Sequence, residues 1–79
     1  MDINEISSIV KYHRKKSGLS QLELANIAGV GKTVIYDLEK GKSTIKLKTL
    51  LHILKALNIS INLQSPLIKY YYNTVHEKG

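Results

Sequence analysis

Apolar residues recur at helical spacing in four stretches of the chain, which predicts a mainly α fold. The first stretch, residues 3–17, begins after Asp2 as a helix cap and ends at Gly18. The fourth stretch, residues 47–57, ends at Asn58, which tolerates the left-handed backbone of a helix terminus. The predicted core stripe of this fourth helix is Leu47, Leu50, Leu51, Leu54 and Leu57.

The two middle stretches are short and nearly adjacent. Residues 21–28 follow a capping box that starts at Ser20, and residues 32–40 precede Gly41. A helix of about two turns does not hold in water by itself, so packing must fix both. Because only residues 29–31 separate the two helices, and two of those three residues are glycine, the spacing predicts a helix-turn-helix.

The hydrophobic period changes from helical to alternating after the fourth helix. Ile59, Ile61 and Leu63 alternate with polar residues up to Pro66, which is the pattern of a strand. A lone strand leaves its N–H and C=O groups unpaired, and the sequence predicts no second strand. We therefore expect this strand to pair with the same strand of a second subunit about a two-fold axis.

The length of 79 residues suffices for one small domain and favours a subunit partner. We expect the domain over residues 1–65 and a C-terminal tail over residues 66–79, in which Tyr70–Tyr72 has no evident role. The absence of Cys excludes disulfides and thiolate metal sites. The acidic N-terminus is unlike a signal peptide, and no apolar run is long enough to cross a membrane. These features predict a cytoplasmic protein without membrane contact.

The charge of the chain favours a polyanionic partner. Twelve Lys and Arg residues stand against six Asp and Glu residues, a formal net charge of +6. Four of these cations lie in the last turns of the first helix: Lys11, Arg14, Lys15 and Lys16. They suit the negative end of a helix dipole, and they also suit contact with phosphate.

Residues 18–41 (GLSQLELANIAGVGKTVIYDLEKG) resemble the helix-turn-helix of the lambda repressor and Cro-like class, the XRE family. Ala25 stands where the two motif helices approach most closely, and Gly29 stands where the turn needs a positive φ. Gly31 departs from the family pattern, since Ser or Thr often caps the second motif helix there. The resemblance extends through the fourth helix and covers residues 6–65.

The predicted C-terminal strand is similar to that of Hip-type antitoxins, whose dimers share a two-stranded sheet. The resemblance implies a lambda repressor-like fold of four helices plus one short strand that pairs across a homodimer. It also implies a sequence-specific DNA-binding repressor with a palindromic operator. Two roles stay open, the antitoxin and autoregulator of an operon that encodes a kinase-like toxin, and a free-standing repressor.

The resemblance further implies which residues meet DNA. The third helix of this class enters the major groove with its N-terminal residues at the base edges. By the family positions, the base-contacting residues are Lys32, Thr33, Val34 and Asp37. The phosphate-contacting residues are Gln21, Tyr36, Lys40, Lys42 and Ser43. The residues themselves leave alternatives open, because Asp37 can instead pair with Lys40 on the same helix and Tyr36 can pack locally.

An enzyme and a pure interaction module are the alternative classes. Residues 29–33 (GVGKT) superficially resemble a phosphate loop, but Asn26 stands where that loop needs its first glycine, and a helix rather than a strand precedes it. We expect no catalysis, no cofactor and no metal, since the three histidines share no ligand spacing: His13, His52 and His76. Asp37 and Glu39 on the third helix keep open an interaction module that has lost DNA binding.

Overall fold

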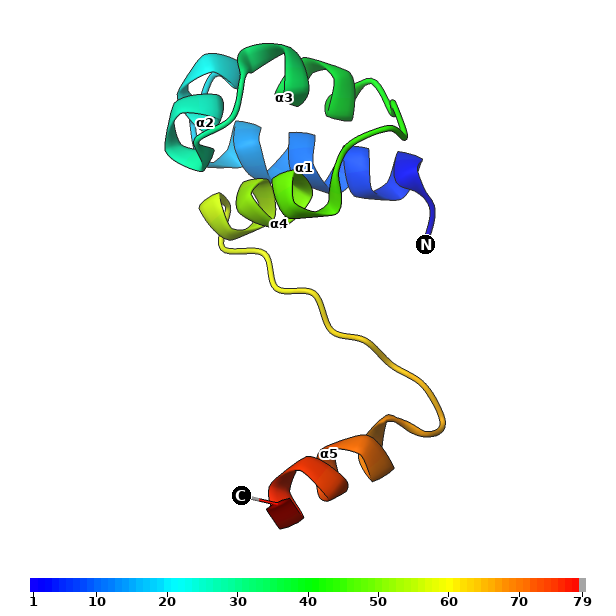
Figure 1. Cartoon of the computed structure of the whole chain (residues 1–79). Coiled ribbons are helices and arrows are strands. Elements are labelled where there is room, and N and C mark those ends of the chain that lie inside the picture. The colour runs from blue at the N-terminus through cyan, green and yellow to red at the C-terminus, as the bar shows by residue number, and fades with distance from the viewer. Residues whose placement is uncertain (79) are drawn as a thin grey trace.

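The computed structural model describes residues 1–78, with side chains described as far as Val75. Its five helices are α1 (Ile3–Lys16), α2 (Gln21–Ala28), α3 (Lys32–Glu39), α4 (Leu47–Ala56) and α5 (Ile68–Lys78). Helices α1 to α4 pack into one body, and α5 lies apart from it at the end of an extended segment (Figure 1). The mainly α class and the four predicted helices are confirmed. None of the helices in residues 1–78 has the length and apolarity of a membrane span.

Caps fix the starts of α1 and α2 as the sequence predicts. The backbone N–H of Glu5 donates to Asp2 Oδ1 at 3.0 Å. Ser20 and Glu23 form a reciprocal capping box, with bonds of 2.9 and 3.0 Å between each side chain and the other residue's N–H. The hydrogen bonds from Ser20 lower the pKa of the Glu23 carboxyl. These local bonds set the boundaries of the helices before any packing is considered.

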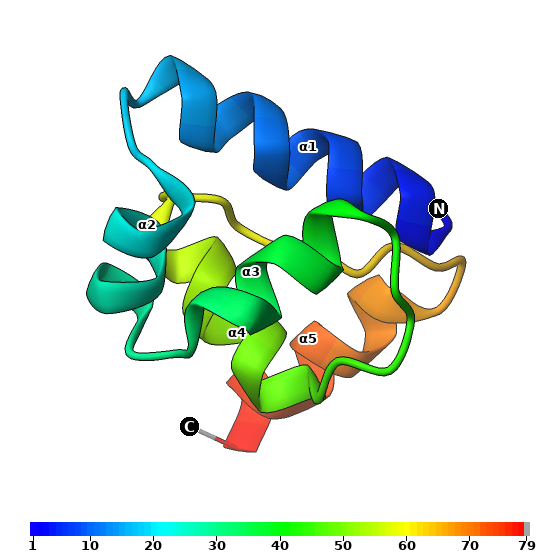
Figure 2. The same cartoon turned by 90° about the horizontal axis from the view of Figure 1, so that it is seen from above.

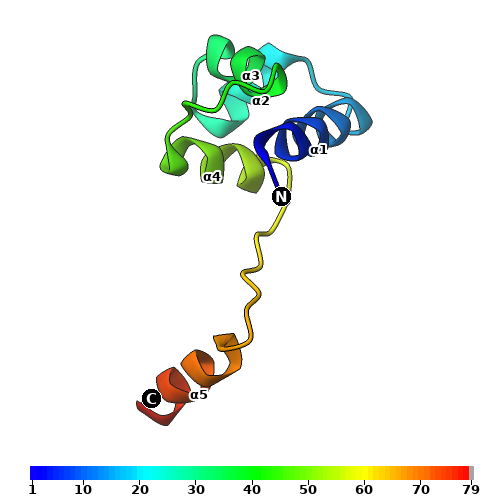
Figure 3. The same cartoon turned by 90° about the vertical axis from the view of Figure 1, so that its right-hand side faces the viewer.

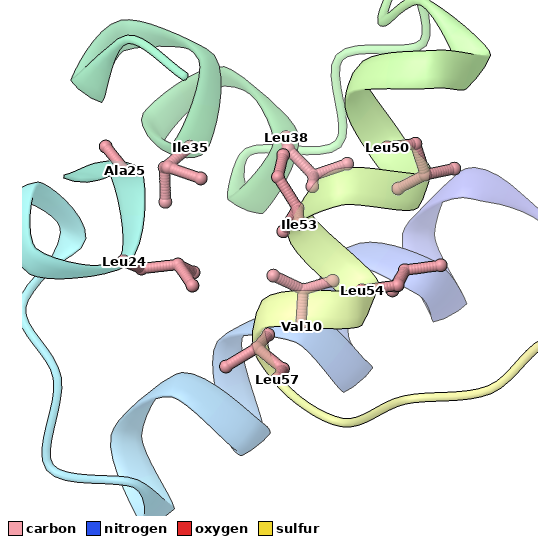
Figure 4. Packing of buried hydrophobic residues seen from close by; sticks show 9 residues of the cluster. All are labelled: Val10, Leu24, Ala25, Ile35, Leu38, Leu50, Ile53, Leu54 and Leu57. Carbon is pink, nitrogen blue, oxygen red and sulfur yellow. The ribbon is translucent and has the colours of Figure 1, made fainter. Parts of the chain in front are cut away.

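Nine buried apolar residues from all four helices of the body form the core (Figure 4): Val10, Leu24, Ala25, Ile35, Leu38, Leu50, Ile53, Leu54 and Leu57. The predicted stripe of α4 is wrong at two positions, because Leu47 and Leu51 are 68% and 44% exposed. Ile53, which the stripe omitted, is fully buried. A helix packed on one side buries a limited arc of its surface. In α4 that arc centres on Ile53, which leaves Leu47 and Leu51 at its edges.

The predicted C-terminal strand is not present within residues 1–78. Residues 59–64 are extended but form no ladder, and Ile61 and Leu63 are 50% and 72% exposed. A ladder needs a second strand, and the described residues of a single chain do not supply one. The described residues therefore contain one helix more than the four predicted, and the predicted strand does not form within the single chain.

Residues 68–78 of the expected tail form α5, a helix that the sequence pattern did not predict; Gly79 lies outside the described residues. Pro66 ends the extended segment as predicted, but it also stands just before a helix, where its missing N–H does no harm. The first turn closes through a bond from the Ile68 N–H to the Ser65 carbonyl at 3.3 Å. The sequence did not predict this helix, because the residues after 72 are mostly polar and form no apolar stripe that would face a core.

Candidate nucleic-acid interface

Helix α3 lies on the outside of the body, on the side opposite the departing C-terminal segment (Figures 1 and 3). Ile35 and Leu38 on its inner side are 0% and 1% exposed, and α3 packs against α2 and α1. A helical repeat of 3.6 residues then turns Lys32, Thr33 and Tyr36 outward, and all three are exposed. The packing of these two residues thus decides which side chains of α3 a ligand can meet. In the view from above, the ribbon of α3 lies in front of the body (Figure 2).

The turn between α2 and α3 has the geometry that the sequence predicts. Gly29 has φ +72°, a left-handed conformation that strains any residue with a side chain. The Val30 N–H then donates to the Ala25 carbonyl at 2.9 Å and closes the end of α2. Ala25 is 1% exposed between the helices, and a larger side chain there would push them apart. Gly31 begins α3 without a side-chain cap, as its departure from the family pattern implies.

The residues predicted to read bases do not share one environment. Lys32 and Thr33 are exposed at the start of α3, whereas Val34 is half-buried and packs against the core. Asp37 lies one turn further on, and its Oδ2 is 3.5 Å from Lys42 Nζ. The side chains of this ion pair are 35% and 59% exposed. Asp37 therefore has a cation partner, but it is Lys42 in the following loop rather than Lys40 on the helix.

The residues predicted to contact phosphate surround the end of α3. Tyr36 is 49% exposed, and its ring carries Lys40 Nζ at 5.4 Å from the centroid. Lys42 and Ser43 are exposed in the loop that follows. Gln21 differs from these four, because it is half-buried and its amide donates to Glu39 Oε1 at 3.3 Å. Two exposed lysines, Lys46 and Lys48, extend the basic surface to the start of α4.

An ion pair that the sequence did not predict fixes α3 to α1. Arg14 Nε and Nη2 donate to the two carboxylate oxygens of Glu39 at 2.6 and 2.9 Å. Its Nη1 donates to the Leu19 carbonyl at 2.8 Å. The two side chains are only 10% and 4% exposed. Arg14 is therefore removed from the basic cluster expected to meet phosphate, and Glu39 does not face a ligand.

One signal in the sequence points to this pair. Arg14 follows Val10 by four residues, so it lies on the same face of α1 as a core residue. A buried Arg requires a carboxylate or carbonyl partner. The choice of Glu39 over the other acidic residues, however, depends on how α3 crosses α1, and no spacing in the sequence gives that crossing.

The free energy of unfolding is expected to fall with acid through Glu39. Burial raises the pKa of its carboxyl, but hydrogen bonds from Arg14 and Gln21, together with nearby positive charge, bring the net pKa below the ordinary value. A lowered pKa stabilises the fold above the unfolded-state pKa, and this contribution is lost as the pH falls through the folded-state pKa. Chemical denaturation of wild type and Glu39→Gln from about pH 7 to about pH 3 measures it. The two free energies should converge at the acid end, and a constant difference would contradict the assignment.

No cluster of three or more metal-ligating side chains occurs among the residues that the structure describes. The side chain of His76, one of the three histidines without ligand spacing, lies outside them.

Comparison with protein families agrees with the helix-turn-helix formed by α2 and α3. The helix-turn-helix family model matches residues 10–64. The chain is 42% identical over 62 residues to the "Uncharacterized HTH-type transcriptional regulator y4mF" of Sinorhizobium fredii (strain NBRC 101917 / NGR234), a match that covers 78% of this chain and 82% of the relative. It is 40% identical over 62 residues to the "Control protein C.SmaI" of Serratia marcescens, covering 77% and 74%.

Solved structures with a similar fold include two that contain HipB. The HipA-HipB-O2-O3 complex matches with a TM-score of 0.76, and the HipB-O4 20mer complex with a TM-score of 0.75. Each is 26% identical to this chain, and each match covers 84% of this chain and 93% of the compared chain.

Proposed function

Because this chain belongs to the XRE-type helix-turn-helix family of DNA-binding transcriptional regulators, we propose that it represses transcription by inserting α3 into the major groove of an operator. The observation that carries the proposal is the outward face of α3, where Lys32, Thr33 and Tyr36 are exposed on a helix that the core holds rigidly. The family consists of regulators and is not an enzyme class. A repressor of this kind acts in the cytoplasm, where its DNA is.

The N-terminal half of α3 reads the bases. Lys32 donates to guanine O6 or N7, and Thr33 bonds a base edge beside it. The exposed part of Val34 touches a thymine methyl group, while its inner part stays in the core. Asp37 accepts from cytosine N4 once Lys42 has turned to a phosphate, and the carboxylate repels sites that place a phosphate or carbonyl there.

The surrounding residues hold the phosphate backbone and set the register of α3. Tyr36, Lys40, Lys42 and Ser43 are all exposed around the end of the helix. Gln21 contacts phosphate from the start of α2, which requires its amide to leave the Glu39 carboxylate. These contacts carry affinity without sequence information.

A homodimer would place two copies of α3 about 34 Å apart, one turn of DNA, which suits a palindromic operator. We propose that residues 1–65 carry both DNA binding and dimerisation. Ile59, Ile61 and Leu63 alternate along an extended segment whose unpaired backbone needs a second strand. The same segment of a second chain, antiparallel about a two-fold axis, supplies that strand.

A role as antitoxin and autoregulator is the finer form of this proposal. It is supported by the likeness to HipB in the HipA-HipB-O2-O3 complex. The corresponding partner here would be a kinase-like toxin encoded in the same operon. Co-purification of the full chain with the product of its neighbouring gene tests this part separately from DNA binding.

The test of DNA binding is a gel-shift titration of the full chain against its own upstream region and a scrambled duplex of equal length. We expect a preference for the upstream region of at least about a thousandfold, as for specific regulators. Footprinting should show two protected half-sites about 10 base pairs apart between centres. Equal affinity for both duplexes would contradict sequence-specific repression and favour an interaction module.

Lys42→Ala is expected to weaken binding to all DNA sequences alike. The substitution removes one phosphate contact, and it also leaves Asp37 without its neutralising partner beside the DNA. The slope of log affinity against log salt should become shallower by about one. Titration of both duplexes at several salt concentrations measures this. Lys69→Ala on α5, apart from the body, is the matched control and should keep the wild-type slope.

A further inference from the structure

Helix α5 exposes most of its apolar surface. Leu67, just before it, is 71% exposed, and Tyr70, Tyr71, Tyr72 and Val75 are between 47% and 60% exposed. A helix of 11 residues is marginal in water without a surface to pack on. Three consecutive tyrosines on such a helix are large apolar rings that favour a protein contact. We therefore expect the described part of α5 to pack against a protein surface.

The body has such a surface around the C-terminal half of α4. One hollow of about 400 Å³ lies between α4 and the start of the extended segment, and its lining includes Leu51, Lys55 and Ile61. A second hollow of about 510 Å³ lies between α2 and α4, and its lining includes Ile27, His52 and Lys55. Lys55 lines both hollows, and the two together are here called the α4 surface.

The chemistry of the α4 surface suits a tyrosine-rich helix. Leu51 and Ile27 are 44% and 59% exposed and can cover the rings. Lys55 is exposed and lines both hollows, so its ammonium can lie over the face of an aromatic ring docked there. The same pairing of lysine with tyrosine occurs three times among the described side chains, at ring distances of 5.2 to 5.6 Å.

The path of the chain decides which copy of the α4 surface α5 can reach. Residues 59–67 carry α5 directly away from its own body (Figures 1 and 3). Residues 59–65 are extended and span about 23 Å. A return of α5 to the same body needs a reversal of the chain. The turn at Pro66 and Leu67 comes only after the extended segment has left the body, and it does not bring α5 back to it (Figures 1 and 3). In an antiparallel pair of these segments, each chain instead runs toward the body of the other.

We propose that α5 of each chain docks on the α4 surface of the second copy, as an exchanged arm that locks the dimer. The proposal rests on the dimer in the proposed function and adds the occupant of the α4 surface. The docked helix would not obstruct DNA, because α3 lies on the opposite side of the body from the departing segment (Figure 3). Operator affinity then depends on the arm indirectly, through the population of dimer.

The first test replaces Tyr70, Tyr71 and Tyr72 together by Gln in the full chain, since Gln keeps helix propensity and removes the rings. Sedimentation equilibrium gives the dimer dissociation constant. We expect it to rise at least about tenfold. Leu51→Gln on the receiving side should act in the same direction. The matched control is Tyr12→Gln, an exposed tyrosine on α1 at 60%, and it should leave the constant unchanged.

Two results of this test would overturn the arm and separate it from the underlying dimer. A triple variant that dimerises as tightly as wild type would contradict the docking of α5 and leave the strand-paired dimer unaffected. A wild-type chain that stays monomeric at all concentrations would contradict both the dimer and the docking of α5.

A second test identifies the occupant, and the absence of Cys from the chain gives it a clean background. Chains carrying Leu51→Cys and a mass tag are mixed with chains carrying Tyr70→Cys, Tyr71→Cys or Tyr72→Cys, so that each face of α5 is sampled. Oxidation should give a disulfide between tagged and untagged chains. A double variant such as Tyr71→Cys/Leu51→Cys that instead closes within one chain would show that α5 packs on its own body. No disulfide from any pair would equally reject the docking.

Discussion

Arg14→Ala is expected to lower the free energy of unfolding by about 3 kcal/mol, the largest effect of any single substitution considered for this chain. The substitution leaves the Glu39 carboxylate, 4% exposed, without the two hydrogen bonds that compensate its burial. It also removes the donor to the Leu19 carbonyl, where α1 passes to α2. Domains of this size have only about 4–10 kcal/mol in total. Urea denaturation at neutral pH measures the loss.

The control for this prediction is Lys15→Ala, an exposed cation next in the sequence, which should change the free energy by less than about 0.5 kcal/mol. A double variant, Arg14→Met/Glu39→Met, tests the cause. If the loss comes from an unpaired buried charge, the double variant should recover most of it, because apolar residues of similar volume need no partner. A double variant as unstable as Arg14→Ala would assign the effect to packing instead.

Lys32→Ala is expected to lower operator affinity about tenfold to a hundredfold and to affect a scrambled duplex much less. Lys32 is exposed in the first turn of α3, so its removal leaves the helix and core unchanged. A donor to guanine carries sequence information, whereas a phosphate contact does not. The ratio of the two affinities should therefore fall, in contrast to Lys42→Ala, which should leave the ratio nearly constant.

Parallel titrations of wild type, Lys32→Ala and Lys42→Ala against both duplexes at one salt concentration decide between the two kinds of contact. Far-ultraviolet circular dichroism of each variant checks that the fold is intact. Equal losses on both duplexes for Lys32→Ala would reassign Lys32 to the phosphate backbone, with the recognition role left to Thr33 and its neighbours.

Local chemistry made much of this protein predictable. Caps at Asp2 and Ser20, a left-handed glycine at Gly29 and helical spacing elsewhere fixed four helices and the turn between the middle two. The outward exposure of Lys32 and Thr33 followed, because any helix that buries Ile35 and Leu38 must turn the start of its other face to solvent. These features depend on residues within one or two turns of one another.

The errors arose where a residue's environment depends on distant parts of the chain. Leu51 was placed in the core because its spacing fits the stripe, but only the packing angle of α4 shows that it lies outside. The strand over residues 59–64 does not form within the single chain, because a ladder also requires a partner, which the proposed dimer would supply. The helix beyond Pro66 was not predicted because its sequence shows no apolar stripe at helical spacing.

The sequence by itself determined the four helices of the body, the tight turn and the family of this protein, since each rests on short-range sterics and hydrogen bonds. The tertiary structure alone decided which charged side chains are buried and which pair with one another. It turned Arg14 and Glu39 inward as partners and paired Asp37 with Lys42. The reason is that a charge acts according to its burial and its nearest opposite charge, and both are set by how the helices cross.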